Sequence, residues 1–379
     1  MTEDLRDTSL KEIARLFLKL GIIGFGGPAV HIAMMEEEVV RKRKWMSHEH
    51  FLDLVGATNL IPGPNSTEMT MHIGHERAGW KGLLLAGACF IVPAVVITAC
   101  IAWAYNIYGQ LPRVQPFVYG IKPAIIAVVA ITMYHLGRKA IKTMQLGIVG
   151  LVAALLVLYG WNEIIVLFGA GLVGVFLNWI SRHRNRAVGL LPFPILQVAL
   201  SMVDESTIKL FLIFLKIGAI LYGSGYVLFA FLDAELVSTG MLTKQQLIDS
   251  IAVGQFTPGP VFSSATFIGW QLGGVTGAAA ATIGIFLPSF LFVGLLNPLV
   301  PKLRSSRIFS AFLDTVNVAS VAIILAVLVE MSKETLRDWR TMLIAIVSLV
   351  VTFYFRRINT AFIVIGGALL GYLLTLMQL

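Results

Sequence analysis

Hydrophobic positions along this chain form long, nearly uninterrupted runs, and polar residues gather in the short segments between them. In the first half the runs cover residues 10–34, 51–73, 82–105, 117–136, 146–158 and 164–180. Uniformly apolar runs are typical of membrane helices, because about 20 residues are needed to cross the hydrocarbon core. The pattern predicts an all-α polytopic membrane protein.

Composition supports this class and argues against nucleic acid as a partner. Charged residues make up 13% of the chain and hydrophobic residues 57%, whereas an average soluble domain has about 25% charged residues. The net charge is +8, but the basic residues cluster between apolar runs, at 41–44, 182–186 and 356–357. Such clusters are typical of cytoplasmic loops of membrane proteins. No nucleic-acid partner and no cofactor are expected.

The chain contains two copies of one unit. The segment FLKLGIIGFGGPAV from Phe17 is repeated as FLKIGAILYGSGYV from Phe214, 197 positions later. Likewise, NLIPGPNS from Asn59 matches QFTPGPVF from Gln255 at an offset of 196, and residues 79–94 match 274–289 at 195. We therefore predict a first transmembrane repeat at 1–181, a linker at 182–207 and a second repeat at 208–379.

Each repeat has a run that is interrupted by a Pro-Gly-Pro sequence, at Pro62, Gly63 and Pro64 and again at Pro258, Gly259 and Pro260. Proline removes a backbone donor and clashes with the preceding helical turn, so the helix must break there. The arms on either side have only about ten residues each, too short to span a bilayer. Each repeat is therefore predicted to contain a re-entrant helical hairpin plus about five membrane crossings.

An odd number of crossings would place the second repeat upside down relative to the first. Loop charges agree with this prediction. Residues 41–44 are all basic, whereas the matching loop at 233–246 contains only Lys244. Since basic loops stay in the cytoplasm, the two loops are expected on opposite sides. Inverted repeats are typical of secondary transporters with a central site, so the two Pro-Gly-Pro turns are expected to be buried and to approach each other.

Broken helices at membrane depth are expected to bind an anion. Non-helical backbone occurs at membrane depth only where it is buried in protein or lines a water-filled cavity. Each helix start carries a partial positive charge of about +0.5, which attracts anions. Gly24, Gly26 and Gly27 predict a second break in the first repeat, with Gly223 and Gly225 as counterparts. The alternative is that these residues only permit kinks and close helix packing.

These motifs together resemble the chromate ion transporter family, in its long form with two fused homologous halves. The resemblance is carried by GFGGP at 24–28, PGP at 62–64 and TPGP at 257–260, and it covers nearly the whole chain. It implies a multi-pass protein of a prokaryotic cytoplasmic membrane that exports chromate, with transport coupled to the proton motive force or to anion exchange.

Polar residues inside the apolar runs are further candidates. Lys122 is either a cation of the site or a lysine that extends to the interface, and Asn317 occupies its position in the second repeat. Glu68, with His72 one turn later, is either a coupling carboxyl or an ordinary solvated residue at the aqueous mouth. His72 and His75 resemble half a metal site without further ligands, so no metal is expected.

The predicted substrate-binding residues extend over both repeats, and Glu68 and His72 are predicted to couple transport. The substrate-binding set is Gly26, Gly27, Pro62, Gly63, Pro64, Asn65, Ser66, Thr67, Lys122, Gly223, Gly225, Pro258, Gly259, Pro260, Ser263, Ser264 and Asn317. Expected partners are chromate or a sulfate-like dianion, membrane lipid and, as one alternative for the assembly, a second copy in a homodimer. Alternative functions are transport of sulfate or another small anion, and a membrane enzyme acting on lipid-linked phosphate, for which no metal cluster or Ser-His-Asp set is evident.

Overall fold

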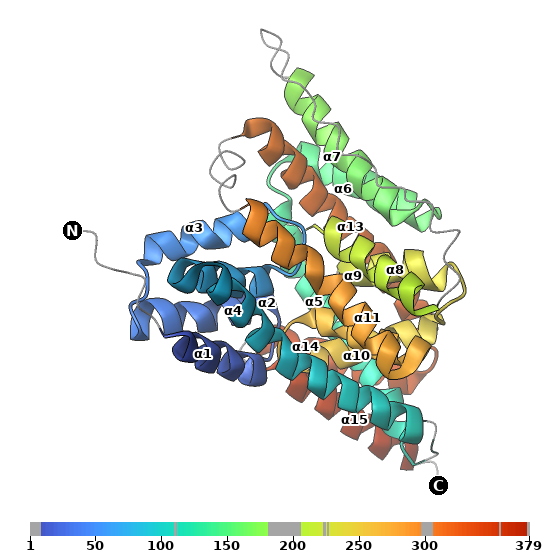
Figure 1. The fold of residues 1–379 in the computed structure, drawn as a ribbon. Helices are drawn as coiled ribbons and strands as arrows, with labels where there is room; N and C mark the ends of the chain where they lie inside the picture. Colours follow the sequence, from blue (N-terminus) through green and yellow to red (C-terminus); the bar gives the residue numbers. More distant parts are fainter. Residues whose placement is uncertain are drawn as a thin grey trace, which may run out of the picture.

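A computed structural model describes residues 9–109, 111, 113–180, 206–222, 225, 227–296, 306–355 and 358–376. Every regular element in these residues is helical (Figure 1), so the predicted all-α class is confirmed. Residues 182–205 of the predicted linker lie outside the described residues.

The described residues of the first repeat form seven α-helices and one π-helical segment, η1. They are α1 (Leu10–Ile23), α2 (Pro28–Met35), η1 (Glu36–Lys42), α3 (His48–Thr58), α4 (Asn65–Tyr108), α5 (Gln115–Ala140), α6 (Met144–Leu158) and α7 (Glu163–Ile180). The breaks before α2 and α4 fall at the glycines and at the Pro-Gly-Pro sequence, where the backbone cannot continue a helix.

The second repeat follows the same order. Its elements are α8 (Ser206–Ile220), α9 (Val227–Leu232), η3 (Asp233–Val237), α10 (Lys244–Phe256), η4 (Val261–Ser263), α11 (Ser264–Leu296), α13 (Arg307–Thr335), α14 (Trp339–Tyr354) and α15 (Thr360–Leu376). Both repeats therefore place a short broken helix, a π-helical segment and a short arm ahead of a long helix.

The long helix α4 reverses direction near its first third. Ala78 and Gly79 have non-helical backbone angles, and Gly79 has φ +58°. In a continuous helix, residues 74 and 82 would lie about 12 Å apart, yet a Cβ atom on Gly74 would come within 2.3 Å of the Gly82 carbonyl oxygen. Residues 65–77 and 80–108 are therefore two packed arms. The same turn recurs in α11 at Gly273 and Gly274.

Helices of the two repeats are interleaved. Helix α5 of the first repeat packs on α14 and α15 of the second repeat. Helix α13 of the second repeat packs on α6 and α7 of the first. Close contact depends on glycines, since a Cβ on Gly120 of α5 would lie 2.1 Å from the Gly367 carbonyl oxygen of α15. The two long helices α4 and α11 also pack on each other. The buried centre is thus built from both repeats.

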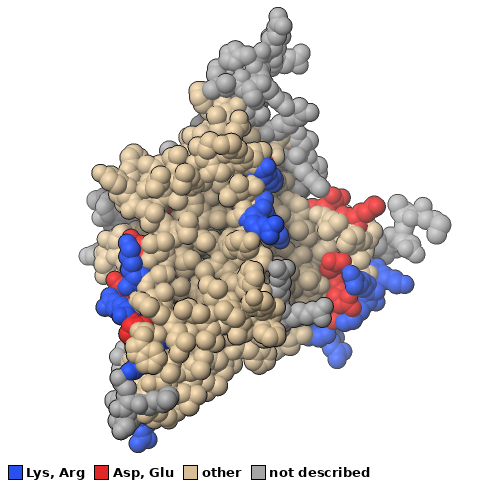
Figure 2. Space-filling view, turned by 180° about the vertical axis from the view of Figure 1, so that it is seen from behind, with Lys and Arg blue, Asp and Glu red and all other residues tan. Residues whose placement is uncertain are grey.

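The outer surface suits a bilayer. By length and composition, four helical segments of the described residues are long and apolar enough to cross a membrane: Asn65–Tyr108, Gln115–Ala140, Val261–Leu295 and Ile308–Thr335. Shorter apolar helices such as α6, about 22 Å long at 1.5 Å per residue, accompany them. Charged side chains form a few groups on the face in Figure 2, and most of that face carries none. The predicted five crossings per repeat and the hairpin stay predictions.

Candidate anion site at the broken helices

The first helix of each repeat ends at a break in the helical backbone. The helix α1 ends at Ile23, and Gly26 and Gly27 have φ of +109° and +82° before α2 begins at Pro28. Only glycine adopts such angles readily. In the second repeat α8 ends at Ile220 and α9 begins at Val227. Gly225 lies in this break, and Gly223 lies outside the described residues.

Each Pro-Gly-Pro segment is buried and is hydrogen-bonded to the break in the other repeat. The backbone N–H of Gly63 donates to the Leu221 carbonyl oxygen at 2.8 Å, and that of Gly259 donates to the Gly24 carbonyl oxygen at 2.7 Å. Gly24 and Leu221 lie 197 positions apart, the offset of the repeat in that region. Both Pro-Gly-Pro segments therefore make the same contact across the two repeats.

The helices that follow these segments start in buried surroundings without a side-chain cap. No side-chain hydrogen bond caps α4 at Pro64 or η4 at Pro260. The first N–H groups of a helix have no partner within it, and they attract anions. An uncapped, buried helix start therefore offers donors to a bound anion from each repeat.

Small hydroxyl groups surround these helix starts. Ser66, Thr67, Ser263 and Ser264 are at most 1% exposed. The Thr67 Oγ1 and Ser264 Oγ atoms are buried without a hydrogen-bond partner, whereas the Ser263 hydroxyl accepts a 3.3 Å bond from Thr98. The Asn65 amide, by contrast, donates to the Asn59 side chain at 2.7 Å. Of the predicted polar set, Thr67 and Ser264 thus have unused hydrogen-bonding capacity.

Glu68 lies inside the protein and is not solvated. Its exposure is 0%, which overturns the interpretation of Glu68 as an ordinary residue at an aqueous mouth. The Ser289 hydroxyl of α11 donates to its Oε1 at 3.4 Å, and its Oε2 has no hydrogen-bond partner. His72, one turn further on, is 1% exposed. Ser289 was missed from the sequence, because a lone serine in an apolar run gives no signal.

Lys122 is paired with an acid that the sequence interpretation did not select. Its Nζ lies 3.1 Å from Oδ1 of Asp249 on α10, and the Tyr105 hydroxyl of α4 donates to Oδ2 at 2.6 Å. The positive charge of Lys122 is therefore compensated in this structure. Asn317, the repeat equivalent of Lys122, lies half-buried on α13. The one available sequence signal for Asp249 was its repeat partner Asp53, 196 positions earlier.

Glu38, in the acidic stretch of η1, forms a partly buried ion-pair cluster. The Glu38 side chain is 9% exposed. It accepts hydrogen bonds from Lys19 at 3.0 Å, from Lys42 at 3.3 Å and from Arg43. Burial acts to raise the pKa of Glu38, but these three hydrogen bonds outweigh it and hold the pKa at about 2. In the second repeat Lys216 and Glu235 form the equivalent pair at 2.7 Å.

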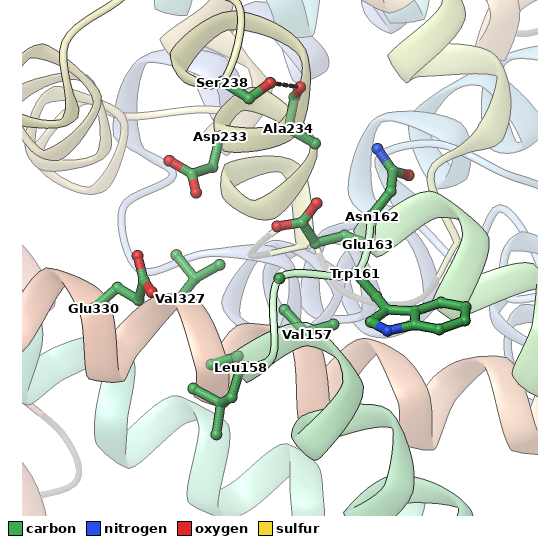
Figure 3. Close-up of a pocket in the computed structure, with 12 residues that line it drawn as sticks. Val157, Leu158, Trp161, Asn162, Glu163, Asp233, Ala234, Ser238, Val327 and Glu330 are labelled. Atoms are coloured by element: carbon green, nitrogen blue, oxygen red, sulfur yellow. Dashed lines mark hydrogen bonds between the residues drawn. The ribbon is translucent and has the colours of Figure 1, made fainter.

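A separate cavity of about 280 Å³ lies where α7, η3 and α13 meet (Figure 3). Its walls include the carboxyl groups of Glu163, Asp233 and Glu330, and Glu330 pairs with Lys244. Burial raises the pKa of Glu163 to about 7, and the charges of Asp233 and Glu330 add to this rise. Converging carboxyl groups make this lining acidic, which disfavours a dianion.

Comparison with known proteins identifies the family. The chromate transporter family profile matches the chain twice, over residues 11–175 and 208–372. A probable chromate transport protein of Synechococcus elongatus is 31% identical, with 90% of this chain and 89% of the relative aligned. Chromate transport proteins of Cupriavidus metallidurans and Pseudomonas aeruginosa are 29% and 28% identical, over 96% and 86% of this chain and 92% and 82% of theirs. No solved structure matches the chain. With both halves matched, the chain belongs to the chromate transporter family.

Proposed function

We propose that this family member is a secondary transporter that exports chromate, a small tetrahedral dianion, across the cytoplasmic membrane of a prokaryote. Transport is coupled to the proton motive force or to exchange for another anion. As a member of a transporter family the chain is not an enzyme, which removes the membrane-enzyme alternative. The observation that carries the proposal is the pair of buried, uncapped helix starts, one from each repeat.

The chemistry of these helix starts favours a small oxyanion. Two uncapped starts contribute on the order of one positive charge by the macrodipole estimate, and unpartnered hydroxyls at Thr67 and Ser264 add neutral donors. Neutral donors hold an oxyanion through several moderate hydrogen bonds, so the anion can leave again. Lys122 and Asn317 complete the proposed site from the neighbouring helices α5 and α13, and the glycines and prolines of the breaks shape it.

The two repeats are proposed to lie in the membrane with opposite orientations. The basic loop at 41–44 and the basic-poor loop at 233–246 support this arrangement. The reciprocal hydrogen bonds of Gly63 and Gly259 are also what a two-fold axis in the membrane plane would produce. In this arrangement the Pro-Gly-Pro segments are the tips of two re-entrant hairpins. They enter from opposite sides, so either side can open to the same site. A homodimer is the proposed assembly.

Glu68 is the proposed coupling group, with His72 beside it. A fully buried carboxyl with one unpartnered oxygen is costly to ionise, and acids at membrane depth commonly mark proton pathways. A dianion nearby would be repelled by the carboxylate and tolerated by the protonated acid. Proton uptake and anion binding are thereby linked.

Uptake of labelled chromate and labelled sulfate into inverted vesicles, with and without a pH gradient, tests the proposal. Chromate accumulation that depends on the gradient supports proton coupling, and accumulation that needs an internal anion supports exchange. Sulfate uptake that excludes chromate would assign the alternative substrate. Vesicles that accumulate neither anion above empty controls would refute the proposed function.

A further inference from the structure

Asp249 forms a buried junction between the two repeats. It lies on α10, the arm that leads to the second Pro-Gly-Pro segment, while Lys122 lies on α5 and Tyr105 on α4 of the first repeat. The side chains of Lys122 and Asp249 are 16% and 6% exposed. A buried ion pair needs both partners, because removing one leaves an uncompensated charge in the interior. The pair therefore favours α10 lying against α5.

The equivalent arm of the first repeat, α3, is placed differently. It packs on α4 and η1, whereas α10 packs on α11, α5 and α15. Accordingly, Asp53 on α3 is exposed and its repeat equivalent Asp249 is buried. In Figure 1, α3 lies at an edge of the molecule and α10 within it. One molecule thus contains equivalent arms in two placements. We call α10, which packs on α5 and α15 of the bundle, docked, and α3, which packs on α4 and η1, undocked.

If α10 took the placement of α3, the Asp249 carboxylate would move from the interior to an exposed position like that of Asp53. Lys122 would then be left in the interior without a counter-ion. A dianion entering from that side is the compensating charge available to it.

We propose that Asp249 is a resident counter-ion that neutralises Lys122 while α10 is docked, and that the substrate dianion replaces it on Lys122 when α10 undocks. Asp249 is in this sense a positioning residue, since it acts through Lys122. Tyr105 holds its second oxygen. The inference rests on the proposed anion transport. It explains how the substrate-free protein can change conformation without leaving Lys122 as an unpaired charge in the interior.

The first test measures docking without using the substrate. Ser250 on α10 is fully buried, so Ser250→Cys, in a background with Cys89→Ala and Cys100→Ala, should react slowly with a membrane-impermeant maleimide. Asp249→Asn should raise the labelling rate on the order of tenfold, as expected for a typical coupling between two sites. The matched control is Asp314→Asn, which removes the half-exposed partner of Lys142, 2.7 Å away, and should leave labelling unchanged. Equal rates in the Asp249→Asn and parent proteins would overturn the inference.

The second test uses chromate and sulfate with the purified protein and with proteoliposomes. Asp249→Asn should bind chromate on the order of tenfold more tightly and retain chromate–chromate exchange, while net transport falls because the empty protein returns poorly. Lys122→Gln combined with Asp249→Asn should fold yet bind weakly. Unchanged or weaker binding by Asp249→Asn, in protein that folds normally, contradicts the inference. If the parent binds neither anion, the proposed function fails, and the labelling result still decides whether Asp249 holds α10.

Discussion

The backbone N–H of Gly63 donates a 2.8 Å hydrogen bond to the carbonyl oxygen of Leu221, which joins the Pro-Gly-Pro segment of one repeat to the first-helix break of the other. Buried backbone groups need partners, and a helix break leaves several unpaired. The reciprocal bond, from the Gly259 N–H to the Gly24 carbonyl oxygen, satisfies the equivalent groups at the break in the first repeat. The two repeats thus stabilise each other's breaks while the following helix starts stay uncapped.

Gly63→Ala should destabilise the protein and abolish transport. Gly63 has φ +138°, and a Cβ atom would lie 2.3 Å from Oε1 of Glu68 and 2.4 Å from the Ser289 hydroxyl oxygen. The backbone strain alone is about 1–3 kcal/mol. Thermal unfolding in detergent and vesicle uptake are the measurements. Gly240→Ala is the control, because Gly240 also has positive φ but open space around it; an equal loss in both variants would show that crowding at Glu68 is irrelevant.

Removing the unpartnered hydroxyl of Thr67 or of Ser264 should weaken chromate binding without lowering the stability of the protein. Thr67→Val and Ser264→Ala are expected to lose about 1.5–3 kcal/mol of chromate affinity, as for a hydrogen bond to a charged group. Their unfolding free energy should stay constant or rise, since an unpartnered buried polar atom is costly. Thr70→Val is the control, because its hydroxyl donates to the Thr67 carbonyl oxygen at 2.6 Å, so stability should fall there and affinity should not. Binding titrations and denaturation of the same samples decide.

Glu68→Gln should uncouple transport from the pH gradient. The amide resembles the protonated acid in shape but cannot release a proton, so chromate exchange should continue while stimulation by a pH gradient disappears. Uptake at matched expression, with and without the gradient, measures this. Glu76→Gln changes an exposed acid near the other end of the same arm, beside His50, and should keep the stimulation. Gradient-stimulated uptake by Glu68→Gln would exclude this carboxyl as the coupling group.

Glu38 should make stability depend on acid pH. Its folded pKa of about 2 lies below the usual value of about 4.3 for glutamate, so its stabilisation is complete above about pH 4.3 and is lost as the pH falls toward 2. Glu38→Gln should cost about 2 kcal/mol at pH 7 and flatten the stability profile in that window. Glu235→Gln removes the equivalent acid, which forms one ion pair, to Lys216, among the described residues, and should cost less. Urea unfolding between pH 2 and 7 provides the comparison.

The chain just after each of the two π-helical segments, including the start of α3, should lie on opposite sides of the membrane in the two repeats. Glu49→Cys and Thr239→Cys place thiols at exposed positions in a protein freed of Cys89 and Cys100. An impermeant maleimide added to intact cells should label position 239 and leave position 49 unlabelled until the cells are opened. Labelling of both positions from the same side would refute the inverted arrangement.

The sequence by itself determined the helical class, the duplication and the positions of the breaks. Apolar runs fix the helices because lipid leaves the backbone no partner but itself, and Pro64 and the glycines at 24, 26 and 27 end helices for local steric reasons. In the structure α1 ends at Ile23, α2 begins at Pro28 and α4 begins at Asn65, next to these residues, whereas α3 already ends at Thr58. Features that depend on neighbouring positions along the chain were therefore predictable.

Only the tertiary structure decided which side chains meet. Two contacts join residues that are far apart in the chain, Lys122 with Asp249 and Ser289 with Glu68. The complete burial of Glu68 depends on which face of its helix points inward, which the sequence did not predict. Along α10 polar and apolar residues alternate without a clear helical period, so the sequence cannot show which face of α10 packs on α5. The different placements of α10 and α3 depend on packing between the repeats, which the local sequence of either arm does not show.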